Sequence, residues 1–278
     1  MTKLPILEFH CCGKVSQDEL QDIRDILEEC YSRLGEGRKI PDRVEVRLFE
    51  TSDKLLEFLQ REKKELGIGT SGDEAFFCSH DAWRGYSRLS VCLERLNTLS
   101  PIARLGALRH EVAHSVLHGG PEYYTVRIPA DCVAVASKRG VAPAMLQQVL
   151  YYSAIAVKDF EVTRLLLKAG YSECQVAFIE SVFTASEADK LAWSLLSSNP
   201  QGKFIFLCSQ LKTLLLGIAL EIAGLVELER WNDQMLFYVS PQERRDWLVF
   251  ARNLALQLGD ITQENIQLVL RTVLVYEA

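Results

Sequence analysis

The chain has 278 residues, which is enough for one large domain or two smaller ones with a substantial core. Hydrophobic residues make up 48% of it and charged residues 24%, a composition typical of a soluble globular protein. The net charge of −6 at pH 7 offers no basic surface to a nucleic acid or to an anionic membrane, so neither partner is expected.

Eight cysteines are scattered along the chain without a CxxC pair, far below the density of a disulfide-stabilised scaffold. Several lie in apolar runs, where cysteine acts as a small core residue. The first 15 residues lack the apolar stretch and the small-residue cleavage site of a signal peptide. These patterns predict a protein of the reducing cytoplasm.

Strand and helix patterns alternate over the first hundred residues. Pro5–Cys12 has strand character, and a Ser-x-x-Glu capping box then opens an amphipathic helix over Ser16–Leu34. Arg43–Glu50 alternates apolar and polar residues, as a half-buried strand does. A second helix is predicted over Ser52–Leu66, where glycines end it.

Two further strands and one well-delimited helix follow. Glu74–Ser79 and Ser87–Leu96 are predicted strands, joined by a short loop. Ser100 followed by proline is a strong helix start, and Gly119-Gly120-Pro121 ends that helix sharply. The sequence therefore predicts a helix over Pro101–His118.

Only helical patterns occur after Pro143. The predicted helices are Pro143–Lys168, Ser186–Ser197, Phe204–Glu229, Pro241–Leu258 and Thr262–Val275. We predict an α+β protein with a mixed α/β part over residues 1–170 and a helical part over 171–278. The helix at about 143–168 belongs to the first of these parts.

The most apolar segment of the chain is Phe204–Leu228. Gln210, Lys212 and Glu221 interrupt it, and its longest uncharged run is far shorter than the ~20 residues that span a bilayer. Because charges inside a membrane are costly, we expect a pair of buried helices and no membrane span.

The segment LRHEVAHSVLHGG, residues 108–120, holds three of the five histidines. His110 and His114 lie one helical turn apart, so their imidazoles project from the same face. With Glu111 they form the pattern H-E-x-x-H, which supplies two zinc ligands and the general base of metal-assisted hydrolysis.

A hydrolytic zinc site needs a third protein ligand, and three residues are candidates. His118 continues the four-residue spacing but is carried around the helix from His110, and is otherwise expected to be an exposed helix-end residue. Asp159 shares the inward apolar stripe of its helix, where a carboxylate is costly without a positive partner that zinc would provide. Glu161 lies about 200° from that stripe. Asp159 is the first choice, with Glu161 and His118 as alternatives.

These two motifs resemble those of zincin metallopeptidases of the gluzincin kind, in which an acid on a later helix joins H-E-x-x-H. The string Asp159-Phe160-Glu161-Val162-Thr163-Arg164 is similar to the second motif of that family. The resemblance implies Asp159 as the third ligand and Thr163 as its hydrogen-bonding support. The order of elements over residues 16–118 is also similar to the zincin core.

The resemblance implies a zinc-dependent peptidase that cleaves a peptide or protein substrate. Zinc would lower the pKa of its water toward ~7 and polarise the scissile carbonyl, and Glu111 would pass the proton to the leaving amine. The second motif has Asp where Glu is usual, which favours one alternative: a non-catalytic metal-binding domain that acts as an interaction or regulatory module. The oligomeric state is left open.

The sequence also offers candidates for a substrate-binding strand, for an oxyanion stabiliser and for further metal sites, each on less evidence. Ser87–Glu94 is the strand that would hold an extended substrate in a zincin, or else an ordinary interior strand. Four tyrosines lie within reach as candidate oxyanion stabilisers: Tyr123, Tyr124, Tyr151 and Tyr152. Arg109 is expected in solvent. Metal sites at His10–Cys12 and at Cys78 with His80 are disfavoured, because each has too few convergent ligands.

Overall fold

The computed structural model describes residues 4–66 and 76–276, which form two compact units. Of the described residues, 4–66, 76–124 and 168–178 belong to the first unit, and 125–167 and 179–276 belong to the second. This division differs from the predicted boundary at residue 170, because most of the helix that carries Asp159 groups with the helical unit.

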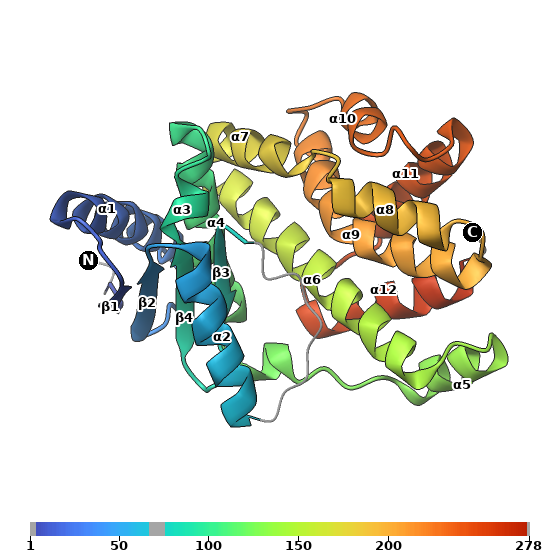
Figure 1. The fold of residues 1–278 in the computed structure, drawn as a ribbon, viewed down its shortest axis with the longest axis horizontal. Coiled ribbons are helices and arrows are strands. Elements are labelled where there is room, and N and C mark those ends of the chain that lie inside the picture. The colour runs from blue at the N-terminus through green and yellow to red at the C-terminus, as the bar shows by residue number, and fades with distance from the viewer. Residues whose placement is uncertain (1–3, 67–75, 277–278) are drawn as a thin grey trace. The chain divides into compact units, whose positions relative to one another are not determined.

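A four-stranded sheet forms the first unit's framework, in the order β1-β2-β4-β3 (Figure 1). The strands are β1 (Ile6–Cys12), β2 (Arg43–Phe49), β3 (Cys78–Asp81) and β4 (Ser87–Cys92). β1, β2 and β4 are parallel, whereas β3 is antiparallel to β4. Together with the helices this makes the protein α+β, as the sequence predicts.

The helices of this unit include the three that the sequence predicts, and each of those three begins within one residue of its predicted start. They are α1 (Gln17–Leu34), α2 (Ser52–Leu66), α3 (Leu93–Leu96), α4 (Pro101–His118), the 3-10 helix η1 (Pro121–Tyr124) and the first part of α7 (Ser172–Val182). Ser16 caps α1 by accepting from the Glu19 amide at 3.1 Å. Ser100 caps α4 by accepting from the Ala103 amide at 3.3 Å. Both predicted helix starts are confirmed.

The predicted strand Ser87–Leu96 is too long. β4 ends at Cys92, and Leu93 begins the short helix α3. The Glu94 carboxylate of that turn accepts from the Ser52 amide at 2.7 Å, at the start of α2, and this contact favours a helical turn over further extension. Glu74 and Ala75 of the other predicted strand, and the glycines after Leu66, lie outside the described residues.

The two faces of the sheet carry different side chains. Arg88 pairs in register with Asp81, and Leu89 pairs with His80. Arg88 bonds to Glu62 of α2, so α2 covers the face with Arg88 and Asp81. Because side chains alternate along a strand, His80 lies on the opposite face, where its ring stacks on His114 of α4. β3 thus turns its second face toward the H-E-x-x-H helix.

A buried ion cluster joins α2 to the sheet. Both terminal nitrogens of Arg88 bond to the Glu62 carboxylate, at 2.6 and 2.8 Å, and its Nε bonds to Asp81 at 2.9 Å. Arg84 reaches Glu62 at 2.9 Å. Burial raises the pKa of Asp81 to about 6, since Arg88 offsets only part of the desolvation and is shared with Glu62.

From the raised pKa of Asp81 we predict how the free energy of unfolding changes with pH in the acid range. An Asp81 pKa of about 6 in the folded chain, above its ordinary 3.8, means that the folded state binds this proton more tightly than the unfolded state does. The Asp81 contribution to the free energy of unfolding should fall by up to about 3 kcal/mol as the pH rises from about 4 to about 6. Asp81→Asn should remove that slope in urea titrations across this range. A slope identical to the native one would contradict the prediction.

The second unit is helical. Its helices are α5 (Ala130–Lys138), α6 (Pro143–Lys168), α8 (Glu187–Leu196), α9 (Pro200–Ile222), α10 (Leu228–Met235), α11 (Pro241–Ala255) and α12 (Thr262–Val275), with the last residues of α7. The five predicted helices are confirmed in position, but α5, α7 and α10 were not predicted. Predicted helix Phe204–Glu229 ends at Ile222, because Gly224 adopts a positive φ of 71° and turns the chain.

The apolar segment is one helix, α9, rather than a helix pair. By length and composition alone α9 passes as a membrane span, yet 67% of its most apolar window is buried inside the protein. The prediction of a buried segment is confirmed.

Candidate metal centre

Close packing fixes α4, the helix with the H-E-x-x-H motif. A Cβ on Gly106 would come within 2.2 Å of the Cys174 carbonyl oxygen, so only glycine allows α7 to approach this closely. Gln175 of α7 donates to the Gly106 carbonyl at 3.0 Å. On the side of α1, the hydroxyls of Tyr31 and Ser115 bond at 2.6 Å. The helix is therefore a rigid support for its histidines.

His110 and His114 lie on one face of α4, as their spacing predicts. Their ring centroids are 4.9 Å apart and the ring planes are nearly perpendicular, at 72°. His110 is 3% exposed and His114 is 9% exposed. The Phe178 ring packs against His110 at 5.4 Å and limits its motion.

Asp159 lies on α6 and is 6% exposed. Its Oδ2 is 3.2 Å from Nζ of Lys212 on α9, and the Lys212 side chain is half exposed. Lys212 therefore supplies part of the positive charge that a buried Asp159 needs. Lys212 in the middle of the apolar stretch of α9 is the signal that could have predicted a pair with a buried acid.

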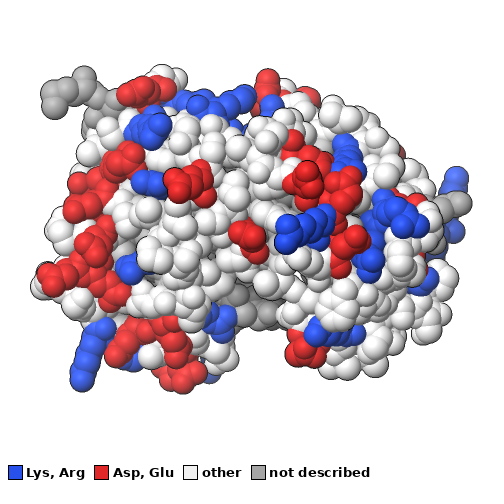
Figure 2. All heavy atoms as spheres, turned by 90° about the horizontal axis from the view of Figure 1, so that it is seen from above, with Lys and Arg blue, Asp and Glu red and all other residues white. Residues whose placement is uncertain are grey.

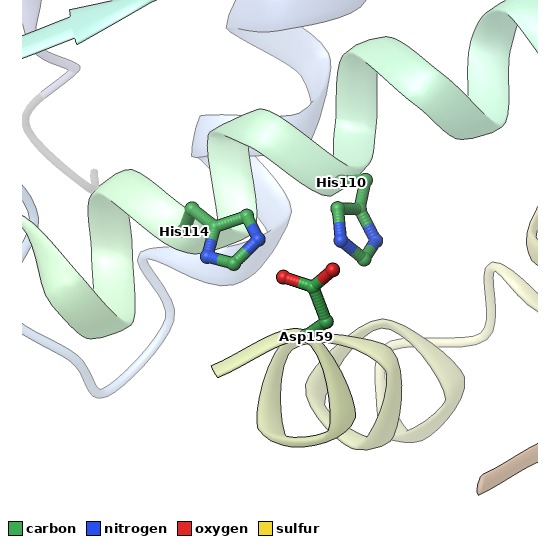
Figure 3. A group of neighbouring side chains, drawn as sticks. All are labelled: His110, His114 and Asp159. Carbon is green, nitrogen blue, oxygen red and sulfur yellow. The ribbon is translucent and has the colours of Figure 1, made fainter. Parts of the chain in front are cut away.

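His110, His114 and Asp159 each offer a ligand atom, and these atoms all lie within 4.8 Å of one another. The Asp159 carboxylate points toward the two imidazole rings (Figure 3). Two imidazole nitrogens and one carboxylate are a donor set that holds zinc in hydrolases and also suits other divalent metals. The residues fit a metal ion, and no second group of this kind occurs among the described residues.

Glu161 and His118, the alternative candidates for the third ligand, form hydrogen bonds with residues other than Asp159. Both carboxylate oxygens of Glu161 accept hydrogen bonds from α12, one from Thr262 at 2.7 Å and one from Asn265 at 2.6 Å. His118 is completely buried, not exposed at the helix end as expected, and its Nδ1 is 3.2 Å from Nδ1 of His114. The Thr163 hydroxyl donates to the backbone carbonyl of Asp159 at 2.9 Å.

Glu111 follows His110 on α4 and is 9% exposed. Burial and the nearby Glu111 carboxylate raise the pKa of the Cys78 thiol on β3. The candidate general base therefore lies near the same strand as His80.

His80 lies near the site, although from the sequence it was only part of a disfavoured metal site with Cys78. Its ring is parallel to that of His114, with centroids 6.2 Å apart. Tyr124 bonds to its Nδ1 at 3.0 Å, and Ser87 lies 3.3 Å from its Nε2. Four of the five histidines therefore cluster along α4 and β3. Only the packing of β3 beside α4 brings His80 to the other three histidines.

The strand, the tyrosines and the arginine near the motif do not all lie where the sequence predicts. β4 is paired on both sides, by β2 and β3, so the strand Ser87–Glu94 is not an exposed edge that could take up substrate. Of the four tyrosines, Tyr123 and Tyr124 contact the histidine cluster, whereas Tyr151 is more than half exposed. Arg109 is not in solvent, because it stacks over the Tyr171 ring and pairs with Glu29 at 3.1 Å.

Comparison with family models, with curated proteins and with solved structures finds no match to this chain. The zincin resemblance stays a prediction from the two motifs, and the metal site stands on the donor geometry alone.

Proposed function

We propose that the chain is a zinc-dependent metallopeptidase. One observation carries the proposal: ligand atoms of His110, His114 and Asp159 lie within 4.8 Å of one another, next to a glutamate in an H-E-x-x-H helix. Zinc at this position would supply an acidified water and would polarise the scissile carbonyl. The same donors occur with other divalent metals, so elemental analysis decides the metal.

The chain's own residues would have distinct tasks in this reaction. His110, His114 and Asp159 would hold the ion and leave one position open. The Glu111 carboxylate would accept the proton of the attacking water and deliver it to the leaving amine. Lys212, whose Nζ lies 3.2 Å from Oδ2 of Asp159, would orient that carboxylate.

We propose a peptide or protein substrate and a cytoplasmic location. The net charge of −6 is unfavourable for polyanions, and Figure 2 shows acidic and basic side chains interspersed on one face.

A non-catalytic metal-binding domain is the second candidate function. The Asp159–Lys212 ion pair favours it, because a carboxylate that already has a cationic partner is a weaker metal ligand. In such a protein the metal would stabilise a docking surface instead of activating water.

Zinc content and peptide cleavage, measured on the same sample, test the proposal. We expect one zinc per chain, cleavage of a mixed fluorogenic peptide library, loss of cleavage on chelation, and recovery on adding zinc back. Stoichiometric zinc without cleavage of any peptide in the library would favour the second candidate. Absence of zinc binding would contradict both.

A further inference from the structure

His118 is the third histidine of the evenly spaced series on α4, and neither proposed function uses it. It follows His114 by four residues, so it lies about 40° further around the helix, at the last turn. Its side chain is completely buried, although it stands at a helix end directly before two glycines. A buried imidazole at such a place requires polar partners.

The contacts of His118 fix its orientation. The 3-10 helix η1 folds back so that the Tyr123 ring meets the His118 ring edge-on, with centroids 5.2 Å apart and planes at 69°. On its other side the His118 ring lies 5.4 Å from the His114 ring. The two Nδ1 atoms face each other at 3.2 Å, a hydrogen-bond distance.

Two imidazoles that meet through their Nδ1 atoms share one hydrogen, so one ring donates and the other accepts. A neutral imidazole carries a single N–H. If His114 donates from Nδ1, its Nε2 bears a lone pair and can bind a metal. His118 then accepts at Nδ1 and carries its own hydrogen on Nε2. The reverse arrangement would place a hydrogen on Nε2 of His114 and block that atom.

We propose that His118 is a positioning residue for the metal site: its Nδ1 accepts the Nδ1 hydrogen of His114 and thereby sets the tautomer and ring angle of that ligand. Metal-binding histidines usually donate their second N–H to a carboxylate or a carbonyl, and loss of such a partner typically weakens metal affinity 10–100-fold. Here the His118 imidazole would be that partner. The inference rests on the proposed metal site, but not on peptide cleavage.

Two substitutions of His118 distinguish the effect of its hydrogen-bond acceptor from the effect of its packing volume. His118→Asn keeps an oxygen near the Nδ1 position, whereas His118→Leu keeps a similar volume without an acceptor. We expect His118→Leu to weaken zinc binding 10–100-fold in competition with a chromogenic chelator, and His118→Asn to stay within about threefold of the native chain. His10→Asn, at an exposed position on β1, is the matched control and should change nothing.

The tautomer gives a second readout, which needs neither zinc nor activity. In the metal-free full-length chain above the pH of imidazole titration, long-range ¹H–¹⁵N spectra should show the His114 hydrogen on Nδ1, and His118→Leu should abolish this preference. Circular dichroism shows whether His118→Leu folds. If it does not fold, the spectrum of the native chain alone still shows which nitrogen of His114 bears the hydrogen.

Three results would overturn the inference: unchanged zinc affinity in folded His118→Leu, a hydrogen on Nε2 of His114 in the native chain, or zinc-induced shifts that make His118 itself a ligand. Failure of the peptidase proposal is distinguishable, because a chain that binds zinc in a His118-dependent way and cleaves nothing upholds this inference alone.

Discussion

Glu111→Gln should abolish peptide cleavage while leaving zinc bound. The amide has nearly the same volume as the carboxylate and fits the same buried position on α4, but it cannot accept the proton of the attacking water. General-base catalysis typically contributes about 10²–10⁴-fold, so the turnover number should fall by at least about 100-fold. The measurements are the turnover number on a cleavable peptide and the zinc content of the same sample.

A glutamate elsewhere in the same unit provides the control. Glu173 lies exposed at the start of α7, and Glu173→Gln should keep native activity and zinc content. Full activity of Glu111→Gln would exclude Glu111 as the base. Loss of zinc together with activity would show instead that Glu111 supports the ligands.

The local signals in the sequence were sufficient for most helix starts. Ser16 and Ser100 each cap a helix through the amide three residues on, and such contacts need no knowledge of the rest of the fold. The end of β4 at Cys92 was not predictable in this way. It depends on Glu94 reaching the Ser52 amide, a contact 42 residues apart that no local pattern records.

The residues of the site also differ in whether a local sequence pattern or a tertiary contact determines their position. The facing of His110 and His114 follows from helical periodicity, and the inward position of Asp159 follows from the apolar stripe of its helix. The burial of His118 and the nearness of His80 depend on η1 folding back and on β3 pairing beside α4. Both are tertiary contacts. The Lys212–Asp159 pair is a third tertiary contact, because the sequence placed Lys212 only in an apolar segment and gave it no partner.

Asp159→Asn and Glu161→Gln form a matched pair that assigns the third ligand. Each replaces a carboxylate on α6 by its amide and preserves the volume. Asp159→Asn should weaken zinc binding by more than about 100-fold, because removal of a ligand exceeds the 10–100-fold loss typical of a supporting residue. Its folding should be nearly unchanged, since the partner left behind, Lys212, is half exposed.

Glu161→Gln should show the opposite pattern. The Glu161 carboxylate accepts from Thr262 and Asn265 at the start of α12, and an amide loses the charge that strengthens both bonds. We expect native zinc affinity and a free energy of unfolding lower by about 1–3 kcal/mol in urea titrations. Loss of zinc in Glu161→Gln with retention in Asp159→Asn would reverse the assignment. The two acids, two residues apart on one helix, would then have exchanged the roles of metal ligand and helix anchor.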